Sequence, residues 1–415
     1  MYWLHLFVSI ICSIVLTEAE QCSKDKQTPT VRLKKDLLCG YDRTVRPTLN
    51  HGNTTKVSVR MVLKSFTYHS HESTLSVNSW LALVWNDEHL VWDPKDYDNL
   101  QTIHINRDSI WYPDLSIYNR ADQSGDPSAL TAVDCLLLHK GNVICIPPTR
   151  HEAICVPNLS KYPFDVQNCT LRFGSWVHSG EEIDFKLTDP PVTTDDFVEN
   201  PEWKLLKVNA SKHSGIFKCC PNNSYPTLNY YFTIERHSGS LICMIVVPAL
   251  GMIFMTLITL VMSPEEMERI ALICSNVIFH LLYLQNISWQ IPISGAQAPL
   301  ILVFARDSLL LTIFTLLLTV IQRKLIRTTT QSPMWMSKMV AAIITSRPGQ
   351  VFFIFDDNLK SVANRIGDED GANIIENSQT QGPNKDWLIF GRILDKICFI
   401  SYCIIYLCMF IAFVP

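Results

Sequence analysis

Apolar and polar residues alternate along much of the first half of the chain. In the stretch KVSVRMVLKSF, Val57, Val59, Met61 and Leu63 occupy every second position, and TLSVNSWLALVW repeats the pattern after a polar turn. Alternation with a period of two is typical of strands that bury one face. Several short strands separated by turn residues predict an antiparallel β-sandwich over residues 20–236.

Long apolar segments replace this alternation in the second half of the chain. They cover residues 240–262, 270–291, 299–322 and 397–414, and their length and composition are typical of transmembrane helices. Near the N-terminus, the short apolar run LFVSIICSIVL precedes small residues, a pattern typical of a signal peptide covering residues 1–19. We therefore expect a multi-pass membrane protein with an extracellular N-terminal half.

An extracellular N-terminus determines the side of the membrane on which each connection lies. The first three spans occupy residues 237–322, and the segment 323–388 that follows them is cytosolic, in agreement with the Lys and Arg residues of IQRKLIR. The middle of that segment is charged and poor in aromatic residues, which predicts partial disorder. Residues 389–415 are expected to form a membrane-associated helix that leads into the fourth span.

The second span, expected to be a helix over residues 268–291, carries more polar residues than its neighbours. Polar groups that face lipid are unfavourable, so one face of this helix should contact water or protein. Alternating steps of four and three residues place one set on a single face: Ala271, Ser275, Ile278, Leu282, Gln285 and Trp289. From the residues alone, two interpretations remain open: a pore-lining helix repeated in a ring of subunits, or a buried helix of an ordinary four-helix bundle.

Charge and short motifs argue against several classes of function. The formal net charge is −4, which is too small to indicate nucleic acid as a partner. The sequence contains no P-loop, zinc-finger spacing or nucleophile elbow. We therefore expect no enzyme activity, no metal site and no cofactor.

Eight of the fourteen cysteines fall in the half that is expected to be extracellular, where disulfides persist. Cys135 and Cys145 flank nine residues and would staple a hairpin, whereas Cys155 and Cys169 bracket thirteen residues that include the motif YPFD. The same half carries five expected glycosylation sequons, at Asn53, Asn158, Asn168, Asn209 and Asn222.

A YPFD motif in a thirteen-residue loop between cysteines, a β-sandwich and four spans together resemble the Cys-loop pentameric ligand-gated ion channels. The segments WYPDLSIYN, NCTLRFGSWVHSG and KCCPNNSYPTLNYYF are similar to the nicotinic acetylcholine receptor branch of that family. The resemblance implies an extracellular β-sandwich followed by a four-helix transmembrane bundle, assembled with four further subunits that are identical or homologous. It also implies the disulfide Cys155–Cys169 and a vicinal disulfide Cys219–Cys220.

The resemblance further implies an agonist site between subunits, for acetylcholine or a related quaternary amine. Such a cation cannot accept or donate hydrogen bonds at its charge and is best held by aromatic faces. The principal face would use Tyr118, Trp176, Phe217, Cys219, Cys220 and Tyr225. The complementary face would come from the neighbouring subunit through Trp80, Leu136 and Ile146. Phe217 stands where the family usually has tyrosine.

The resemblance also assigns roles along the second span. Glu268 stands at the cytosolic start of the pore helix and, repeated around a pentamer, would attract permeant cations and repel anions. The connection SPEEMER lacks the Pro-Ala insertion found in anion-selective relatives. Ile278 and Leu282 would form an apolar gate, and Trp289 stands at the extracellular mouth, where many members have an acid.

The loop between Cys155 and Cys169 would transmit agonist binding to the pore. Its apolar tip would consist of Tyr162, Pro163 and Phe164, and Asp165 would pair with Arg236 before the first span. The leading hypothesis is thus an acetylcholine-type cation channel subunit of a postsynaptic membrane. The alternative is a non-conducting or obligate heteromeric subunit gated by a different amine such as choline. Phe217, Trp289 and the charged residues of the third span, Arg306 and Asp307, favour it.

Overall fold

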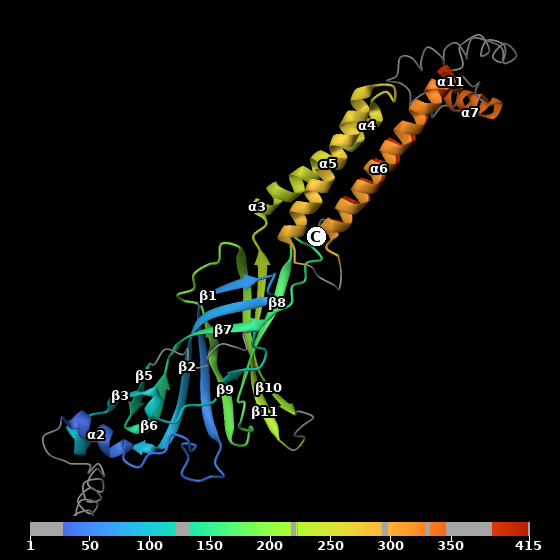
Figure 1. Cartoon of the computed structure of the whole chain (residues 1–415). Coiled ribbons are helices and arrows are strands. Elements are labelled where there is room, and N and C mark those ends of the chain that lie inside the picture. Colours follow the sequence, from blue (N-terminus) through green and yellow to red (C-terminus); the bar gives the residue numbers. More distant parts are fainter. Residues whose placement is uncertain are drawn as a thin grey trace, which may run out of the picture. The chain divides into compact units, whose positions relative to one another are not determined.

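The strands all precede the long apolar helices along the chain (Figure 1). The computed structural model describes residues 28–121, 133–216, 221, 223–292, 298–328, 333–345 and 384–413. Contacts divide the chain into one unit of residues 1–157 and 166–236 and a second unit of residues 158–165 and 237–415. Several predictions concern positions outside the described residues: the signal peptide, the disorder expected within 346–383, Phe217, Cys219, Cys220 and Asn222.

The strands of the first unit form two sheets within the described ranges. One sheet has the order β3-β5-β6-β2-β1-β9, with β7 also paired to β2, and the other has the order β10-β11-β8-β4. Neighbouring strands run antiparallel except β1 and β9, which are parallel. The strands are β1 (Thr55–His69), β2 (Thr74–Val91), β3 (Thr102–Asn106), β4 (Ser116–Ile117), β5 (Asp134–Leu138), β6 (Lys140–Cys145), β7 (Pro148–Ile154), β8 (Val166–Gly174), β9 (Ile183–Thr193), β10 (Trp203–Ile216) and β11 (Ser224–Arg236).

The two sheets share one apolar core, which confirms the predicted sandwich. Phe173 of β8 and Tyr230 of β11 belong to the same buried cluster as the side chains of β1 and β2. Each apolar side chain buried in this way contributes about 1.5–3 kcal/mol. The inward positions predicted on β1 have no exposed surface: Val57, Val59, Met61 and Leu63.

A helix that the alternation does not predict precedes the first strand. Helix α2 (Pro29–Leu38) begins with proline, whose missing N–H is not needed in the first turn of a helix. Leu33 is fully buried in the core of the sandwich, and Leu37, one turn later, packs against the same core. Two short 3₁₀ turns, η1 (Pro94–Tyr97) and η2 (Arg107–Ser109), lie farther along the chain.

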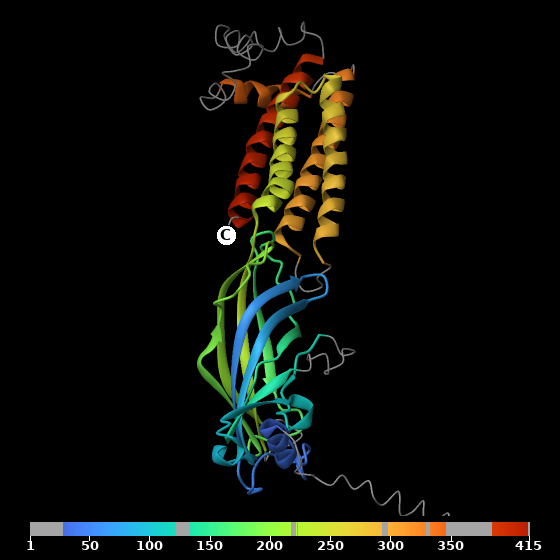
Figure 2. The same cartoon turned by 90° about the vertical axis from the view of Figure 1, so that its left-hand side faces the viewer.

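Four helices of the second unit are long and apolar enough to cross a membrane, counted within the described residues, and they pack side by side (Figure 2). The first combines α3 (Gly239–Leu241), a π-helical turn (Ile242–Val246) and α4 (Val247–Val261). The next two are α5 (Met267–Gln290) and α6 (Leu300–Arg327), followed by the shorter α7 (Met334–Thr345). Helix α11 (Asn384–Phe413) continues without a break into the fourth span.

A buried ion pair joins α5 to α11. Arg269 is fully buried and donates to both carboxylate oxygens of Asp395, at 2.6 and 2.8 Å. Its Nε atom donates to Thr319 of α6 at 3.1 Å, and Gln322 of α6 donates to Asp395 at 3.0 Å. A bidentate pair with these additional hydrogen bonds compensates the loss of hydration that burial of two charges entails.

The tip of the disulfide loop packs with the membrane helices. Tyr162 is 3% exposed, belongs to the same apolar cluster as Ile287 of α5, and donates its hydroxyl to Gln290 at 3.3 Å. The backbone N–H of Leu300 donates to the carbonyl of Ser160 at 3.0 Å. Contacts therefore assign residues 158–165 to the helical unit, although the cysteines at the base of the loop belong to the other unit.

A buried histidine lies within the sandwich. His151 of β7 contacts the edge of the Phe173 ring at a centroid distance of 5.0 Å, and its Nε2 atom lies 2.8 Å from the hydroxyl of Thr149. Burial lowers the pKa of His151 to about 4, because an imidazolium would lose its hydration there. The folded protein therefore keeps His151 neutral at physiological pH.

We expect Asp395→Asn to destabilise the helical unit by about 3–5 kcal/mol, because it leaves the buried charge of Arg269 unpaired. The measurement is the thermal unfolding of the full chain in lipid nanodiscs. The double variant Arg269→Met/Asp395→Leu removes both charges and should recover most of the loss. An Asp395→Asn variant that unfolds at the wild-type temperature would contradict the prediction.

His151 should make the stability of the sandwich fall in mild acid. The pKa is about 4 in the folded state, against about 6.5 in an unfolded chain, so the unfolded state binds the extra proton between these values. The contribution of neutral His151 to the free energy of unfolding is therefore fully present above pH 6.5. It decreases by about 3 kcal/mol as the pH falls to 4. The measurement is the free energy of unfolding across this pH range. The decrease should be absent in His151→Gln and present in the control His104→Gln, which alters an exposed position of β3.

Candidate functional site

The carboxylate of Asp114 organises the segment that follows β8. Its Oδ2 atom accepts hydrogen bonds from the backbone N–H of Trp176 at 2.7 Å, from that of Val177 at 3.0 Å and from the hydroxyl of Ser175 at 3.0 Å. Hydrogen bonds to a charged acceptor are stronger than neutral ones. This anchor holds the backbone at Trp176 while leaving the residue 72% exposed.

Tyr118 lies beside this indole. Its hydroxyl donates to the carbonyl of Ser175 at 2.6 Å, and its ring meets the Trp176 ring edge-on at a centroid distance of 6.1 Å. Burial raises the pKa of Tyr118, and the nearby Asp114 and Tyr225 raise it further, so the hydroxyl stays protonated and donates. Gly174 permits this close packing, because a Cβ atom there would lie 2.6 Å from the Tyr118 ring.

Tyr225 comes to the same region from β11. Next to it, the carbonyl of Ser224 accepts a hydrogen bond from the N–H of Gly180 at 2.7 Å, which ties the start of β11 to the segment that carries Trp176. The structure thus brings three of the predicted principal-face aromatics into one neighbourhood: Tyr118, Trp176 and Tyr225.

The predicted complementary residues lie on one outward face of the other sheet. Val84 pairs with Ile144, and Leu136 pairs with Ile144 as well, so these positions share a face. Because successive residues of a strand alternate between faces, Trp80 lies on the face of Val84, and Ile146, just after β6, continues the face of Ile144. Trp80 and Ile146 are 44% and 46% exposed, large values for apolar side chains.

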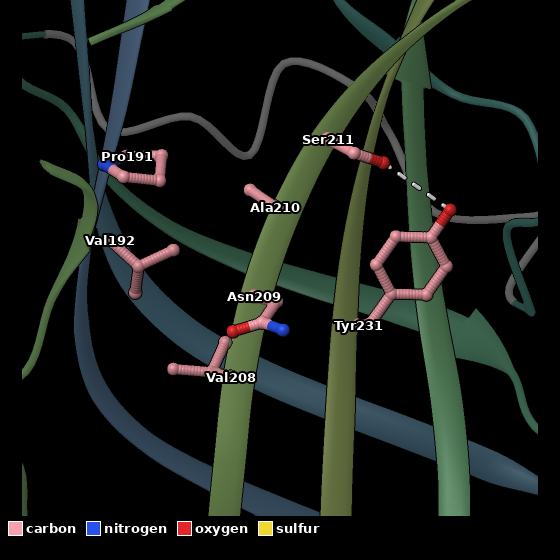
Figure 3. Close-up of a pocket in the computed structure, with 7 residues that line it drawn as sticks. All are labelled: Pro191, Val192, Val208, Asn209, Ala210, Ser211 and Tyr231. Atoms are coloured by element: carbon pink, nitrogen blue, oxygen red, sulfur yellow. Dashed lines mark hydrogen bonds between the residues drawn. The ribbon is translucent and has the colours of Figure 1, made fainter. Parts of the chain in front are cut away.

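The pocket drawn in Figure 3 lies elsewhere in the sandwich and contains none of these aromatics. It has a volume of about 360 Å³, and the hydroxyl of Ser211 donates to that of Tyr231 at 3.4 Å across its edge. Its lining residues are Pro191, Val192, Val208, Asn209, Ala210, Ser211 and Tyr231. Asn209 is a sequon position, and the predicted sequons within the described residues, Asn53, Asn158, Asn168 and Asn209, are all exposed.

Helix α5 has a buried face and an exposed face in the single chain. Arg269, Asn276 and His280 belong to the buried face, and His280 contacts Ser308 of α6 with 2.8 Å between Nε2 and Oγ. The predicted pore residues are offset from this face by about half a turn of the helix. All of them are exposed, as is Glu268 at the start of the helix: Ala271, Ser275, Ile278, Leu282, Gln285 and Trp289.

Two disulfides are present in the described part of the chain. Cys135–Cys145 joins β5 to β6, and Cys155–Cys169 closes the loop whose tip packs with the membrane helices. At the end of the sandwich, Arg236 donates to Glu202 at 3.0 Å and stacks on the Trp203 ring at 4.1 Å. Its pairing with Asp165 stays a prediction.

Sequence reasoning missed the residues that position the aromatic rings. Asp114 and Gly174 were not singled out, although Asp114 directly follows Tyr112 and Pro113 in the WYPDLSIYN segment. An acid next to a turn-forming proline is a signal for backbone hydrogen bonding. Lys64 lies over the Trp80 ring and pairs with Asp196. The residues around Lys64 and Asp196 in the sequence do not indicate either contact.

Comparison with known proteins identifies the class. The model of the neurotransmitter-gated ion-channel ligand-binding domain matches residues 30–238. The chain therefore belongs to the family of Cys-loop neurotransmitter-gated ion channels, and among these it is similar to nicotinic receptor subunits. This match confirms the predicted family and fold class: a multi-pass membrane protein with an extracellular domain, in a family of channels rather than enzymes.

The similarity to nicotinic subunits is distributed over about two thirds of the chain. The neuronal acetylcholine receptor subunit alpha-5 of Homo sapiens is 30% identical over 292 residues, which cover 68% of this chain and 61% of that protein. The alpha-5 subunit of Gallus gallus is 30% identical over 293 residues, covering 69% and 63%. The beta-3 subunit of Homo sapiens is 29% identical over 295 residues, covering 68% and 63%.

Removing the Asp114 carboxylate should release the Trp176 segment. In Asp114→Ala, we expect the amide hydrogens of Trp176 and Val177 to exchange with solvent about ten- to a hundredfold faster, since a hydrogen bond to a charged group contributes about 1.5–3 kcal/mol. Hydrogen exchange of the full chain, read by mass spectrometry, measures this change. Asp114→Asn keeps an acceptor oxygen and should show a smaller increase, whereas equal rates in Asp114→Ala and wild type would contradict the prediction.

Proposed function

We propose that this chain is a subunit of a pentameric cation channel, opened when acetylcholine or a related quaternary amine binds between subunits in a postsynaptic plasma membrane. The observation that carries the proposal is the indole of Trp176, which is 72% exposed and held in place by Asp114 and Tyr118. An exposed indole that is fixed in position, with the Tyr118 ring beside it, offers an aromatic face to a ligand. A quaternary ammonium is a suitable partner for such a ring.

The agonist site would be divided between two subunits. The principal face would combine Tyr118, Trp176 and Tyr225 with Phe217 and the vicinal disulfide Cys219–Cys220, which the family pattern supplies. The complementary face of the neighbouring subunit would be the outward surface around Trp80, Leu136 and Ile146. Principal and complementary groups are carried by different sheets, and this division favours a site completed by a second copy or a homologous subunit.

The pore would be lined by the exposed face of α5. Glu268 from each subunit would form a ring of carboxylates at the cytosolic mouth, which favours cations. Ile278 and Leu282, at 57% and 61% exposed, would form the apolar gate. Because these side chains are exposed in the single chain, their face of α5 is available to line a pore or to contact a neighbouring subunit in the assembly.

Agonist binding would reach this gate through the disulfide loop. The loop begins and ends in the ligand-binding unit at Cys155 and Cys169, whereas Tyr162 at its tip is buried among the membrane helices. A ring closed by a disulfide has few conformations, so displacement of its base would be passed on to its tip. Pro163, Phe164 and the expected Asp165–Arg236 pair would complete this coupling.

One observation favours a second candidate, a non-conducting or obligate heteromeric subunit. Trp289, at the extracellular end of the pore face, is 76% exposed. Identical copies would place an indole from every subunit at the same level of the pore, which narrows it. Mixing with subunits that carry a smaller residue there would relieve this constriction.

The proposal is tested by expressing the full chain in oocytes, alone and together with a nicotinic subunit, and applying acetylcholine and then choline. We expect an inward current that disappears when external sodium is replaced by an impermeant cation. Trp176→Ala should raise the half-maximal acetylcholine concentration at least about tenfold, because a desolvated cation–π contact contributes about 2 kcal/mol. Glu268→Gln should reduce the preference for cations in reversal-potential measurements.

Trp92, a mostly buried tryptophan of the sandwich, offers a control: Trp92→Phe should leave the agonist response near wild type in channels that reach the surface. Current only upon coexpression would favour the heteromeric candidate. Surface expression without current in either case, and without acetylcholine binding, would contradict the proposed function.

A further inference from the structure

A cation from the same chain already occupies the face of Trp80. The Nζ atom of Lys64 lies 3.6 Å from the centroid of the Trp80 ring. The strand register accounts for this placement, because Trp80 pairs with Val62 and Lys64 stands two residues farther along β1, on the same outward face. The strand bulges just here, since Leu63 pairs with Ser79 and Ser65 with Asn78, and the regular alternation of buried and outward positions is broken only after Lys64.

A carboxylate holds this ammonium group over the ring. Asp196 Oδ2 lies 2.5 Å from Lys64 Nζ. Asp196 belongs to the connection between β9 and β10, which is itself fastened to β1: Val198 N–H donates to the Lys64 carbonyl at 2.8 Å, and the Phe197 ring stacks on Phe66 at 6.1 Å. The ring and the acid therefore come from separate elements and converge on one ammonium group.

The position of the ammonium is partly removed from water. The Lys64 side chain is 21% exposed, although its partner Asp196 is 67% exposed and lies at the outer side of the pair. Cation–π attraction and ion pairing are both stronger where water is partly excluded. A second positive charge brought to the same ring face would be repelled by Lys64. A ligand cation can therefore contact this face of Trp80 only after Lys64 has moved away.

We propose that Lys64 determines ligand specificity on the complementary face, as an intramolecular cation that competes with the ligand for Trp80. The inference rests on the proposed function, since it takes Trp80 as part of the agonist site. Small quaternary ammonium ions that need aromatic contacts from both subunits are disfavoured by this competition. Ligands whose cation contacts only the principal face are unaffected.

The first test measures occupancy of the ring and needs no channel activity. The full chain in lipid nanodiscs is treated with an amine-acylating reagent, and modification of Lys64 is compared with that of Lys212, which pairs with Asp184. We expect slow modification of Lys64 in the wild type and faster modification in Trp80→Ala. Tetramethylammonium should accelerate modification of Lys64 and leave Lys212 unchanged.

The second test measures competition by function. In surface-expressed channels, Lys64→Ala should lower the half-maximal concentration of tetramethylammonium by about tenfold, the factor that corresponds to a cation–π contact of intermediate strength. Lys64→Arg keeps a cation over the ring and should resemble the wild type. Lys212→Ala is the matched control and should change nothing. On a Trp80→Ala background, Lys64→Ala should have no further effect.

The outcomes separate this inference from the proposed function. Channels that respond to agonist but show the same potency with and without the Lys64 side chain overturn the inference and leave the proposed function intact. Absence of current and binding in every variant contradicts the proposed function, and the acylation result then decides the inference. Faster modification of Lys64 with tetramethylammonium supports it, whereas a rate that depends on neither tetramethylammonium nor Trp80 overturns it.

Discussion

The ion pair between Arg269 and Asp395 is the contact on which the arrangement of the membrane helices depends. Within a bilayer a buried charge needs a partner, and Arg269 finds its partner Asp395 on α11 and donates a further hydrogen bond to Thr319 of α6. This requirement fixes the rotation of α5 about its axis. With Arg269, Asn276 and His280 turned inward, the opposite face is presented outward from the bundle, and Glu268 lies at its cytosolic end.

Charge is used in a comparable way in the extracellular unit. One oxygen of Asp114 organises the backbone at Trp176, and the absence of a side chain at Gly174 lets Tyr118 approach the indole. On the other sheet, the ammonium of Lys64 covers Trp80. The exposed aromatics on the two faces thus have different surroundings: one indole is displayed and the other carries a cation from its own chain.

Much of the fold could be predicted from local pattern, because each element has its own period. Alternation of apolar and polar residues located β1 and β2. Uninterrupted apolar segments located the first three long helices to within a few residues. The helix that contains the fourth span starts earlier than predicted, at Asn384. Helix α2 was missed, since ten residues with a single fully buried side chain, Leu33, give a weak periodic signal. The sequence pointed to Tyr118 and Trp176, which lie side by side in the structure, but not to Asp114 and Gly174, which position them.

The sequence by itself determined the division into a sandwich and a set of membrane helices, the family, and the stripe of residues along α5. These properties follow from periodicity, segment length and short motifs, which neighbouring residues specify together. Only the tertiary structure decided which charged groups meet, as with Lys64 and Asp196, 132 residues apart, or Arg269 and Asp395, 126 residues apart. Such contacts depend on how distant elements pack, and local patterns carry no information about a partner that far along the chain.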